Sequence, residues 1–414
     1  MAYQPHVFRF GRYLWRYKLT PPGRWLVLGI LMTSIGSITL EVPVYQIFCC
    51  LLALLGISEG VGLLFKPSLS LSGQLPDRSV AGSEVTGLFT LTNTSRWRPA
   101  YDVMLGLFGL PRDIRHTDAD HCISQLDPQE STTISVTVAT PRRGFYPLPP
   151  VQSVSTFPLN LMRFGGDKTE RQNLIVLPSY EPLDEINIPV SHRYQPGGVT
   201  YTAGLGHSPE FVGNRDYIPG EEIKRIDFKA WGRVGRPVVR EYQEEYYCRI
   251  ALIVDTYIPP GTKASNIGFA TLEAAVSLAA AITDRLNINE YVIDLFAAGP
   301  DMYVFRTIGG ATHFDSVLEI LAGVDACRDN PFVKISPLVI EELESISTAI
   351  CLFIDWDETR SEFCNRILES GCLLKAILIR PESTTPTQSS DLASVVDWTE
   401  LTPVQILNGE IHSL

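Results

Sequence analysis

Residues 44–65 read VYQIFCCLLALLGISEGVGLLF, a run whose only charged side chain is Glu59. A helix needs about 20 apolar residues to cross a bilayer, so this run is long enough. Upstream, residues 25–40 read WLVLGILMTSIGSITL and carry no charge, although they reach spanning length only if the helix continues to about Val44. The two runs predict a two-helix membrane anchor over residues 25–66, with Glu59 near its inner end reaching toward the interface.

Basic residues flank the two runs on one side. Five of them precede the first run, Lys66 follows the second, and the turn between the runs carries only Glu41. Because Lys and Arg collect on the cytoplasmic side, the pattern predicts a bacterial inner-membrane protein with nearly all of its remaining residues in the cytoplasm. A cleaved signal peptide is the main alternative, but the basic leader is too long and a second apolar run follows directly. The five residues are Arg9, Arg12, Arg16, Lys18 and Arg24.

The rest of the composition excludes several classes of function. The 414 residues carry a formal net charge of -12, which argues against a nucleic-acid partner, because phosphate binding needs a net cationic face. The eight cysteines form no C-x-x-C pair and the seven histidines form no H-E-x-x-H motif. Free thiols in a reducing compartment are therefore expected, and a zinc site is not. No P-loop is present, and we predict no catalytic residue and no enzymatic activity.

Residues 67–165 consist of short, alternating β-branched runs separated by Gly, Pro, Asn and Asp. Such runs predict several short antiparallel strands. Their spacing favours an immunoglobulin-like β-sandwich, although the sequence does not separate a sandwich from a barrel. Between two of the strands lies the basic turn Pro141-Arg142-Arg143-Gly144. We expect its arginines to be solvated, the alternative being contact with anionic lipid near the anchor.

Residues 210–246, EFVGNRDYIPGEEIKRIDFKAWGRVGRPVVREYQEEY, mix both signs of charge with aromatic side chains. Proline and glycine at positions 219 and 220 predict a turn, residues 223–231 predict a helix with Ile223, Ile226, Asp227 and Ala230 on one face, and residues 237–242 predict a strand. The charges are expected to pair internally, and a protein-binding surface is the main alternative. Acidic residues interleave too closely with the basic ones to leave a stripe for nucleic acid.

This segment resembles a family signature. Arg215-Asp216-Tyr217-Ile218-Pro219-Gly220-Glu221-Glu222, followed by Lys224-Arg225-Ile226-Asp227-Phe228-Lys229, is similar to the R-x-Y-x-P-G-D…R-x-I-x-W-K pattern of the bacterial family known as domain of unknown function fifty-eight. The Arg142-Arg143-Gly144 turn and Pro158-Leu159-Asn160-Leu161, which is similar to the family's P-F-G-L, add support. The resemblance covers nearly the whole chain and implies a hairpin anchor, a β-sandwich, the signature and a von Willebrand A-like domain.

The resemblance also implies a function. Members of this family are typically associated with the MoxR class of AAA+ ATPases and with other von Willebrand A proteins, which implies a role in the maturation or assembly of client proteins. Four positions depart from the family pattern, namely Glu221, Lys224, Phe228 and Asn160, and the first three keep charge or bulk. The residues expected to form the interaction surface are Arg215, Tyr217, Pro219, Gly220, Glu221, Lys224, Arg225, Asp227, Lys229, Arg233, Arg240 and Glu241.

Residues 250–380 alternate between strand and helix patterns. The apolar run at 250–255 ends in an acid, as expected for a strand that is buried on both faces of a parallel sheet. Further strands are expected at 291–298, 302–307, 348–354 and 373–379, and helices at 265–286, 312–322 and 360–370. This alternation predicts a doubly wound α/β domain.

Ligands of such domains bind beyond the carboxyl ends of the strands, where Asp255 and Asp355 are expected. The resemblance to von Willebrand A domains implies a divalent metal there, held by a D-x-S-x-S loop, a Thr and an Asp. Asp255, Thr312 and Asp355 match three of these positions by their order along the chain, whereas Tyr257 and Pro259 replace both serines. These three residues could hold Mg²⁺ with several waters. The alternative is that both acids only end strands and cap helices.

These observations predict a membrane-tethered protein-interaction or scaffold protein that works with a MoxR-type AAA+ ATPase. The alternative is a binding module that depends on a divalent metal. The expected organisation is a cytoplasmic N-terminal segment (1–24), the two-helix anchor (25–66), the β-sandwich (67–165), the connecting signature segment (166–249), the von Willebrand A-like domain (250–380), and a linker and tail (381–414). The tail is either a small packed element or a docking segment.

Overall fold

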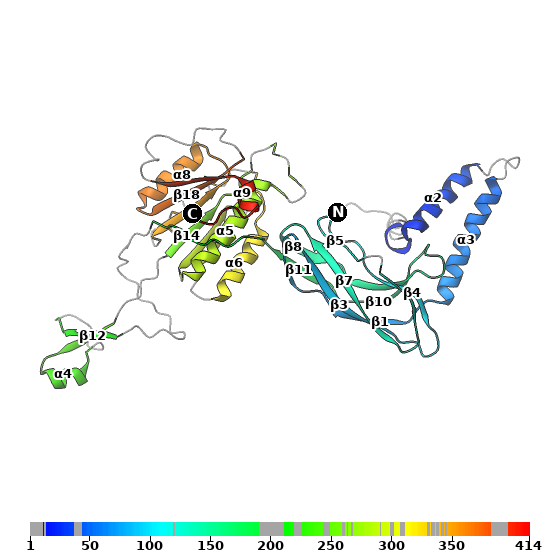
Figure 1. Ribbon diagram of the computed structural model, residues 1–414, viewed down its shortest axis with the longest axis horizontal. Helices are drawn as coiled ribbons and strands as arrows, with labels where there is room; N and C mark the ends of the chain where they lie inside the picture. Colours follow the sequence, from blue (N-terminus) through cyan, green and yellow to red (C-terminus); the bar gives the residue numbers. More distant parts are fainter. Residues whose placement is uncertain are drawn as a thin grey trace. The chain divides into compact units, whose positions relative to one another are not determined.

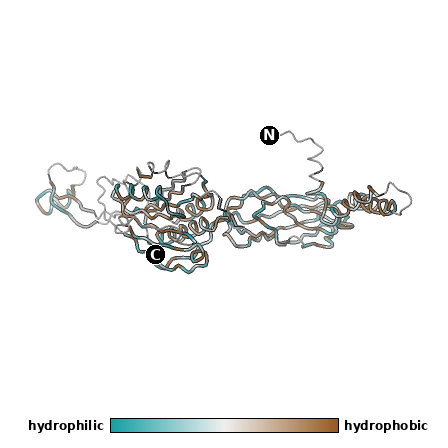
Figure 2. Tube along the Cα trace, turned by 90° about the horizontal axis from the view of Figure 1, so that it is seen from above, coloured by the Kyte–Doolittle hydropathy of each residue, from teal (hydrophilic) through white to brown (hydrophobic). Residues whose placement is uncertain are grey.

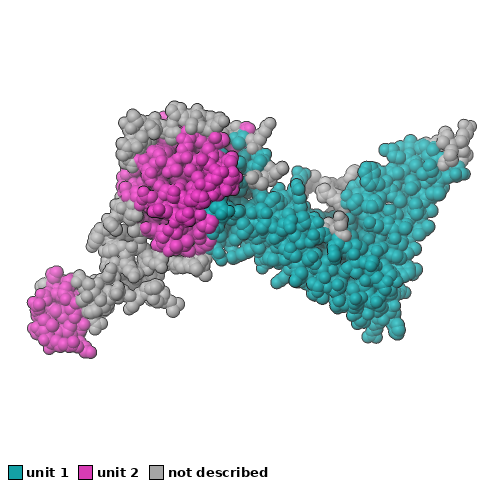
Figure 3. All heavy atoms as spheres, in the orientation of Figure 1, with its two compact units in different colours: residues 1–181, 262–280, 315–325 teal, residues 182–261, 281–314, 326–414 magenta. Residues whose placement is uncertain are grey.

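The computed structural model (Figure 1) describes residues 11, 14–36, 44–118, 121–189, 211–218, 226–242, 249–258, 261–262, 264–265, 268–289, 291–298, 302–306, 311–328, 332, 336, 339–340, 343, 346–381 and 396–414. The chain divides into two compact units, which Figure 3 distinguishes by colour. Unit 1 comprises residues 1–181, 262–280 and 315–325, and unit 2 comprises residues 182–261, 281–314 and 326–414.

Unit 1 begins with a π-helical turn, η1 (Leu14–Lys18), and two helices, α2 (Pro21–Gly36) and α3 (Val44–Leu64). Figure 2 colours much of both helices as hydrophobic. Among the described residues, α3 is the helix that is long and apolar enough to cross a membrane. Helix α2 has only 16 residues, and the expected continuation of its run past residue 36 lies outside the described residues.

The two helices are fixed to the sandwich at their polar ends. A Cβ atom on Gly23 of α2 would overlap the carbonyl oxygen of Leu161, and one on Gly62 of α3 would overlap the ring of Phe164. Glycine is therefore required where these helices meet the sandwich. Glu59 lies 3.4 Å from the ammonium of Lys18, so this carboxylate is paired at the end of α3 where the basic leader lies.

The β-rich region of unit 1 contains β1 (Leu69–Gln74), β2 (Arg78–Val80), β3 (Ser83–Asn93), β4 (Ala100–Leu107), β5 (Arg115–His116), β6 (Cys122–Leu126), β7 (Ser131–Thr140), β8 (Gly144–Leu148), β9 (Val151–Ser155), β10 (Phe164–Lys168) and β11 (Gln172–Leu177). They form two four-stranded sheets, β1-β3-β7-β5 and β10-β9-β4-β6, and a three-stranded sheet, β2-β11-β8. All the pairs are antiparallel except β2 with β11.

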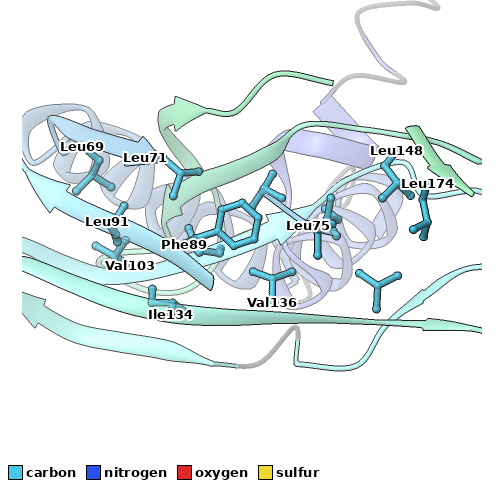
Figure 4. Close-up of a cluster of buried hydrophobic side chains, with 14 of the residues drawn as sticks. Leu69, Leu71, Leu75, Phe89, Leu91, Val103, Ile134, Val136, Leu148 and Leu174 are labelled. Carbon is cyan, nitrogen blue, oxygen red and sulfur yellow. The ribbon is translucent and has the colours of Figure 1, made fainter. Parts of the chain in front are cut away.

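One shared core joins these sheets and confirms the β-sandwich. Buried and exposed residues alternate along β3. Phe89 and Leu91 of the first sheet therefore belong to one core together with Val103 of the second sheet and Leu174 of the third (Figure 4). Full burial of such side chains contributes about 1.5–3 kcal/mol each. Because Leu174 belongs to this core, the sandwich continues past the expected end at residue 165 as far as Leu177.

The arginine turn, residues 141–144, is not the solvated or lipid-binding turn that the sequence suggested. The Arg143 guanidinium is buried within unit 1, where its Nε donates to the carbonyl of Leu321 (3.0 Å) and its Nη2 to that of Val324 (2.7 Å). Its Nη1 pairs with the Glu273 carboxylate. A cation at the last carbonyls of a helix is favourable, so Arg143 caps the C-terminal end of α6 (Ala311–Gly323).

Unit 2 is built on a six-stranded sheet. Its strands are β14 (Arg249–Val254), β15 (Val292–Ala298), β16 (Met302–Arg306), β17 (Thr348–Phe353), β18 (Leu373–Ile379) and β19 (Asp397–Leu401), in the order β16-β15-β14-β17-β18-β19. Only β16 pairs antiparallel. Every residue of β17 is buried, as is every residue of β14 except Arg249, which confirms the expectation that the run at 250–255 is buried on both faces.

The helices that connect strands of this sheet include α5 (Ala270–Ile288), α6 and α8 (Glu358–Glu369). The first half of α5 and the second half of α6 are counted in unit 1. The crossover from β14 to β15 moves across the sheet in one direction, and the crossover from β17 to β18 moves in the other. Because such crossovers are right-handed, α5 and α8 must cover opposite faces.

The C-terminal tail is a packed element, which resolves the alternative that the sequence left open. Strand β19 pairs in parallel with β18, and α9 (Pro403–Leu407) follows it, with Thr402 and Gln405 forming a capping box. Two buried cations pair with acids of β19, each at 2.7 Å: Lys375 of β18 with Asp397, and Arg380, which directly follows β18, with Glu400. Residues 382–395, at the start of the expected linker and tail, lie outside the described residues.

The signature segment forms a small hairpin with one helix. Strand β12 (Phe211–Asp216) pairs antiparallel with β13 (Val238–Tyr242), and α4 (Phe228–Val234) lies between them in the chain. The strand predicted at 237–242 is confirmed. The helix was predicted to include Asp227 and Ile226, but it begins at Phe228, because the Asp227 side chain accepts the backbone N–H groups of Lys229 and Ala230 and so acts as the N-cap. The turn at 218–220 lies partly outside the described residues.

Candidate functional site

The carboxyl ends of β14 and β17 meet at the point where the strand order of unit 2 reverses. Strands β14 and β17 are direct neighbours, and the chain leaves them in opposite directions across the sheet. Ligands of doubly wound sheets bind at such a point. Asp255 follows β14 directly, and Asp355 and Asp357 follow β17. The structure therefore brings the two predicted carboxylates to the same edge of the sheet.

Asp255 is already paired with a cation from the protein itself. Nε of Arg360, in the first turn of α8, donates to Oδ2 of Asp255 at 2.8 Å, and Nη2 lies 2.7 Å from the same oxygen. Backbone N–H groups complete the shell, since that of Tyr257 donates to Oδ1 (2.9 Å) and that of Ile354 to Oδ2 (3.3 Å). Both side chains are at most 1% exposed, so this is a fully desolvated ion pair.

Arg360 has further partners that hold it in place. Its Nη1 donates to Asp357 Oδ2 at 2.7 Å, and the Asp357 side chain also caps α8 by accepting the backbone N–H of Arg360. The guanidinium carbon lies 5.5 Å from the ring centroids of both Tyr257 and Phe332, a distance at which cation–π attraction operates. One guanidinium thus links the ends of β14 and β17 to the start of α8.

Burial and pairing act on Asp255 in opposite directions. Complete removal from water raises the pKa of Asp255, while the Arg360 charge and the two backbone N–H donors lower it. Burial is the largest of these influences, so the pKa of Asp255 lies above its ordinary value, and the Arg360 charge is the largest influence that opposes this shift. Arg360 therefore places a positive charge from within the chain directly against Asp255.

Two of the three predicted metal ligands have described side chains, and the structure gives these two different partners. The Asp355 carboxylate accepts the backbone N–H of Trp356 at 2.8 Å, whereas Asp255 faces Arg360. Thr312 lies in the first turn of α6, and its side chain lies outside the described residues. Within the described part of the chain, no group of three or more His, Cys, Asp or Glu is placed to hold a metal ion. The arrangement favours the alternative in which both acids end strands and organise the following loops.

Arg360 and Asp357 were not among the residues predicted from the sequence. A signal for Arg360 is present, because the buried face of α8 consists of Arg360, Phe363, Cys364 and Ile367, the spacing of an amphipathic helix. An arginine at the first position of an otherwise apolar stripe indicates a buried, paired guanidinium. Asp357, three residues before it, has the position of an N-cap.

The thiols behind this edge of the sheet are structural. Cys351, Cys364 and Cys372 are buried in the core on the α8 side of the sheet, and the Cys372 Sγ donates to the carbonyl of Ile346 at 2.9 Å. Burial raises the pKa of Cys351, and it raises that of Cys364 to about 12. Both thiols therefore stay protonated and weakly nucleophilic at neutral pH.

The predicted signature residues are only partly described. Arg215 and Tyr217 lie on and just after β12, and Lys229 and Arg233 lie on α4, where both are exposed. Arg240 and Glu241 lie on β13, and their side chains are outside the described residues, as are Pro219, Gly220, Glu221, Lys224 and Arg225 altogether. Arg236 forms an ion pair with Asp216 at 3.1 Å, which is an example of the expected internal pairing.

Helix α4 has no buried residue. Phe228 is 62% exposed and Val234 55% exposed, and the ring of Trp231 stacks on that of Phe228 with centroids 6.0 Å apart. A helix normally buries its apolar stripe, and the stripe of α4 instead lies at the surface together with Lys229 and Arg233. Contiguous apolar surface of this kind marks interaction sites.

Comparison with family models and with curated proteins found no match. Among solved structures, the CARDB domain of PF1109 from Pyrococcus furiosus is similar over 27% of this chain and 94% of that chain, with 9% identity and a TM-score of 0.19. A cohesin module of a family 33 glycoside hydrolase from Clostridium perfringens is similar over 27% of this chain and 97% of that chain, with 7% identity and a TM-score of 0.16. The sandwich assignment therefore rests on the sheets and the shared core, and the resemblance to domain of unknown function fifty-eight stays a prediction.

Proposed function

We propose that this protein is a membrane-tethered interaction protein, held by α3 and displaying the exposed face of α4 to a protein partner. The observation that carries the proposal is the apolar stripe of Phe228, Trp231 and Val234, which α4 leaves unburied beside two cations. An interface of this composition fits a partner that presents apolar side chains next to carboxylates. Residues 211–242 carry seven Lys or Arg and five Asp or Glu, in a chain whose net charge is -12.

The proposed anchor has two membrane spans, the run that begins in α2 and helix α3. With two spans, the chain enters and leaves the membrane on the same side. In this proposal the basic leader and Lys66 lie in the cytoplasm together with the sandwich and unit 2, at an inner membrane. Support comes from the length and composition of α3 and from the Lys18–Glu59 pair at its polar end. With the location fixed in this way, the sandwich serves as a spacer.

The proposed partner is an AAA+ ATPase of the MoxR class, and the proposed role is to assist the maturation or assembly of client proteins. This partner follows from the resemblance of residues 215–229 to the family signature. The sheet order and the acids at its carboxyl edge support a von Willebrand A-like domain in unit 2. In this proposal Arg360 takes the place of the metal, so that docking needs no divalent ion.

A domain that requires a divalent metal is the alternative, and calorimetry separates the two. If Arg360 neutralises Asp255, titration of Mg²⁺ or Mn²⁺ into the full chain in detergent gives no binding heat. Heat that disappears in Asp255→Ala would favour the metal-dependent module.

The docking proposal is tested by detergent co-purification of the tagged full chain, with mass spectrometry of its partners. We expect an AAA+ ATPase to be recovered with the wild type. Its recovery should fall tenfold or more in Lys229→Glu/Arg233→Glu and in Trp231→Ala, which corresponds to a loss of about 1.4 kcal/mol or more of binding free energy. The matched control is Arg112→Glu, an exposed charge reversal on the sandwich. Partner recovery that is the same in all variants would reject α4 as the contact surface.

A further inference from the structure

The loop of residues 94–99, here the tryptophan loop, lies beside the end of α3. Nη1 of Arg98 donates to the carbonyl of Leu64, the last residue of α3, at 3.2 Å. The next residue, Phe65, packs its ring against Phe157 and Tyr101, with centroid distances of 5.6 and 6.5 Å. The point where the chain leaves the proposed membrane span is therefore joined directly to this loop.

The tryptophan loop is held firmly by hydrogen bonds, and yet it exposes its largest side chain. Asn93 Nδ2 donates to the carbonyl of Arg98 at 2.9 Å, and the Ser95 hydroxyl accepts the backbone N–H of Arg98 at 3.0 Å. Gln129 Nε2 donates to the carbonyls of residues 94 and 95. In this framework the Trp97 side chain is 88% exposed. An indole held away from the protein core is suited to the membrane–water interface, where Trp side chains collect.

The charges around Trp97 favour an anionic surface. Arg96 and Arg98 flank it, and Lys66 lies two residues beyond the end of α3, and all three are exposed. Two acids lie on the turn that supports the loop, and both are engaged within that turn. Asp127 accepts from Gln125 Nε2 (2.6 Å), and Glu130 accepts the backbone N–H of residue 127 (2.7 Å). Each Lys or Arg at an anionic bilayer surface strengthens binding.

We propose that the tryptophan loop is a lipid-contact site, in which Trp97 inserts among the headgroups while Arg96 and Arg98 bind the phosphates of anionic lipids. This inference rests on the proposed membrane span of α3, because the bond from Arg98 to Leu64 places the loop at the level where that span ends. In this proposal the loop orients the sandwich on the bilayer. Trp25, near the start of α2, is 74% exposed, and it provides a second Trp side chain for the same membrane–water interface.

Tryptophan quenching in bilayers tests this proposal. The full chain and its Trp97→Phe variant are reconstituted into bilayers whose lipids carry bromine near the headgroup, with and without phosphatidylglycerol. The difference in emission between the wild type and Trp97→Phe gives the emission of Trp97. We expect the brominated lipid to quench most of this emission, and to quench more of it when phosphatidylglycerol is present. Trp231→Phe is the matched control, because we expect the brominated lipid not to quench the emission of Trp231. Arg96→Gln/Lys66→Gln should weaken the dependence on anionic lipid, because Arg98 is then the one cation of the three that remains.

Carbonate extraction of the same membranes separates the two proposals. If the chain resists carbonate but Trp97 is quenched by aqueous iodide and not by brominated lipid, the lipid-contact site is wrong and the span stands. If carbonate releases the chain, the span and the site both fail. Quenching that is equal in neutral and anionic bilayers would overturn the role of Arg96 and Arg98. Because Trp97 is exposed, its replacement by Phe is expected to leave the fold unchanged, which near-ultraviolet circular dichroism checks.

Discussion

Arg360→Met is expected to destabilise unit 2 by about 3–5 kcal/mol, because it leaves the Asp255 carboxylate buried without a cation. Methionine keeps most of the apolar bulk between Tyr257 and Phe332, so the loss reports the charge and its hydrogen bonds rather than a cavity. The measurement is urea unfolding of the detergent-solubilised chain, followed by the emission of Trp356 and Trp398, which contact each other in this domain.

Arg366→Met on the same helix is the control. Arg366 is exposed and donates to the hydroxyl of Ser336 at 3.2 Å, so its replacement is expected to cost at most about 1 kcal/mol. Equal effects of the two substitutions would show that the Asp255–Arg360 pair has no special role in this sheet.

The Arg360→Met variant should also change how stability depends on pH. Burial raises the pKa of Asp255, and removing Arg360 takes away the largest influence that lowers it. The folded variant then binds a proton on Asp255 more tightly than the unfolded chain does, so its stability rises as pH falls through this raised value. The deficit relative to wild type is therefore larger at about pH 8 than at about pH 5. A deficit that grows on acidification would contradict this account of the pair.

Arg143→Met is expected to lower the melting temperature of unit 1 strongly, while Arg142→Met lowers it little. Loss of Arg143 leaves the Glu273 carboxylate, which is 13% exposed, and two helix-end carbonyls without their donor. A cost of about 3 kcal/mol corresponds to a shift of roughly 6–12 °C in a domain of this size. Thermal unfolding of the solubilised chain followed by circular dichroism measures it.

Arg142 in the same turn is the control for Arg143. Arg142 lies 3.6 Å from Asp325, whose side chain is 78% exposed, and an exposed pair of this kind contributes less than about 1 kcal/mol. Similar shifts for the two variants would indicate that the turn acts through its backbone, and the capping of α6 by Arg143 would then be wrong.

Periodicity predicted the α/β domain well and the environment of its side chains poorly. The strands expected at 348–354 and 373–379 and the helix at 312–322 are within one residue of β17, β18 and α6, because buried strands and amphipathic helices leave local patterns. The pairing of Asp255 with Arg360 joins residues that are far apart in the sequence, so no local pattern could reveal it.

Single residues account for the other differences. Asp227 was placed on a helical face by its spacing, but its short carboxylate competes for backbone N–H groups and instead begins the helix. Arg143 was expected in water, because an Arg-Arg pair in a turn is usually solvated, and only the tertiary contact with Leu321 and Val324 overrides this expectation. Leu174 and Val176 lie beyond the expected boundary of the sandwich, because β11 completes a sheet with two strands from earlier in the chain.

Our central proposal is that α3 and the run beginning in α2 hold the chain in a bilayer, with the sandwich and unit 2 on the cytoplasmic side. External protease applied to spheroplasts that express the chain with a C-terminal epitope tests this claim most directly. We expect the epitope to survive in intact spheroplasts and to be digested once the membrane is permeabilised. Digestion in intact spheroplasts would contradict the proposed topology.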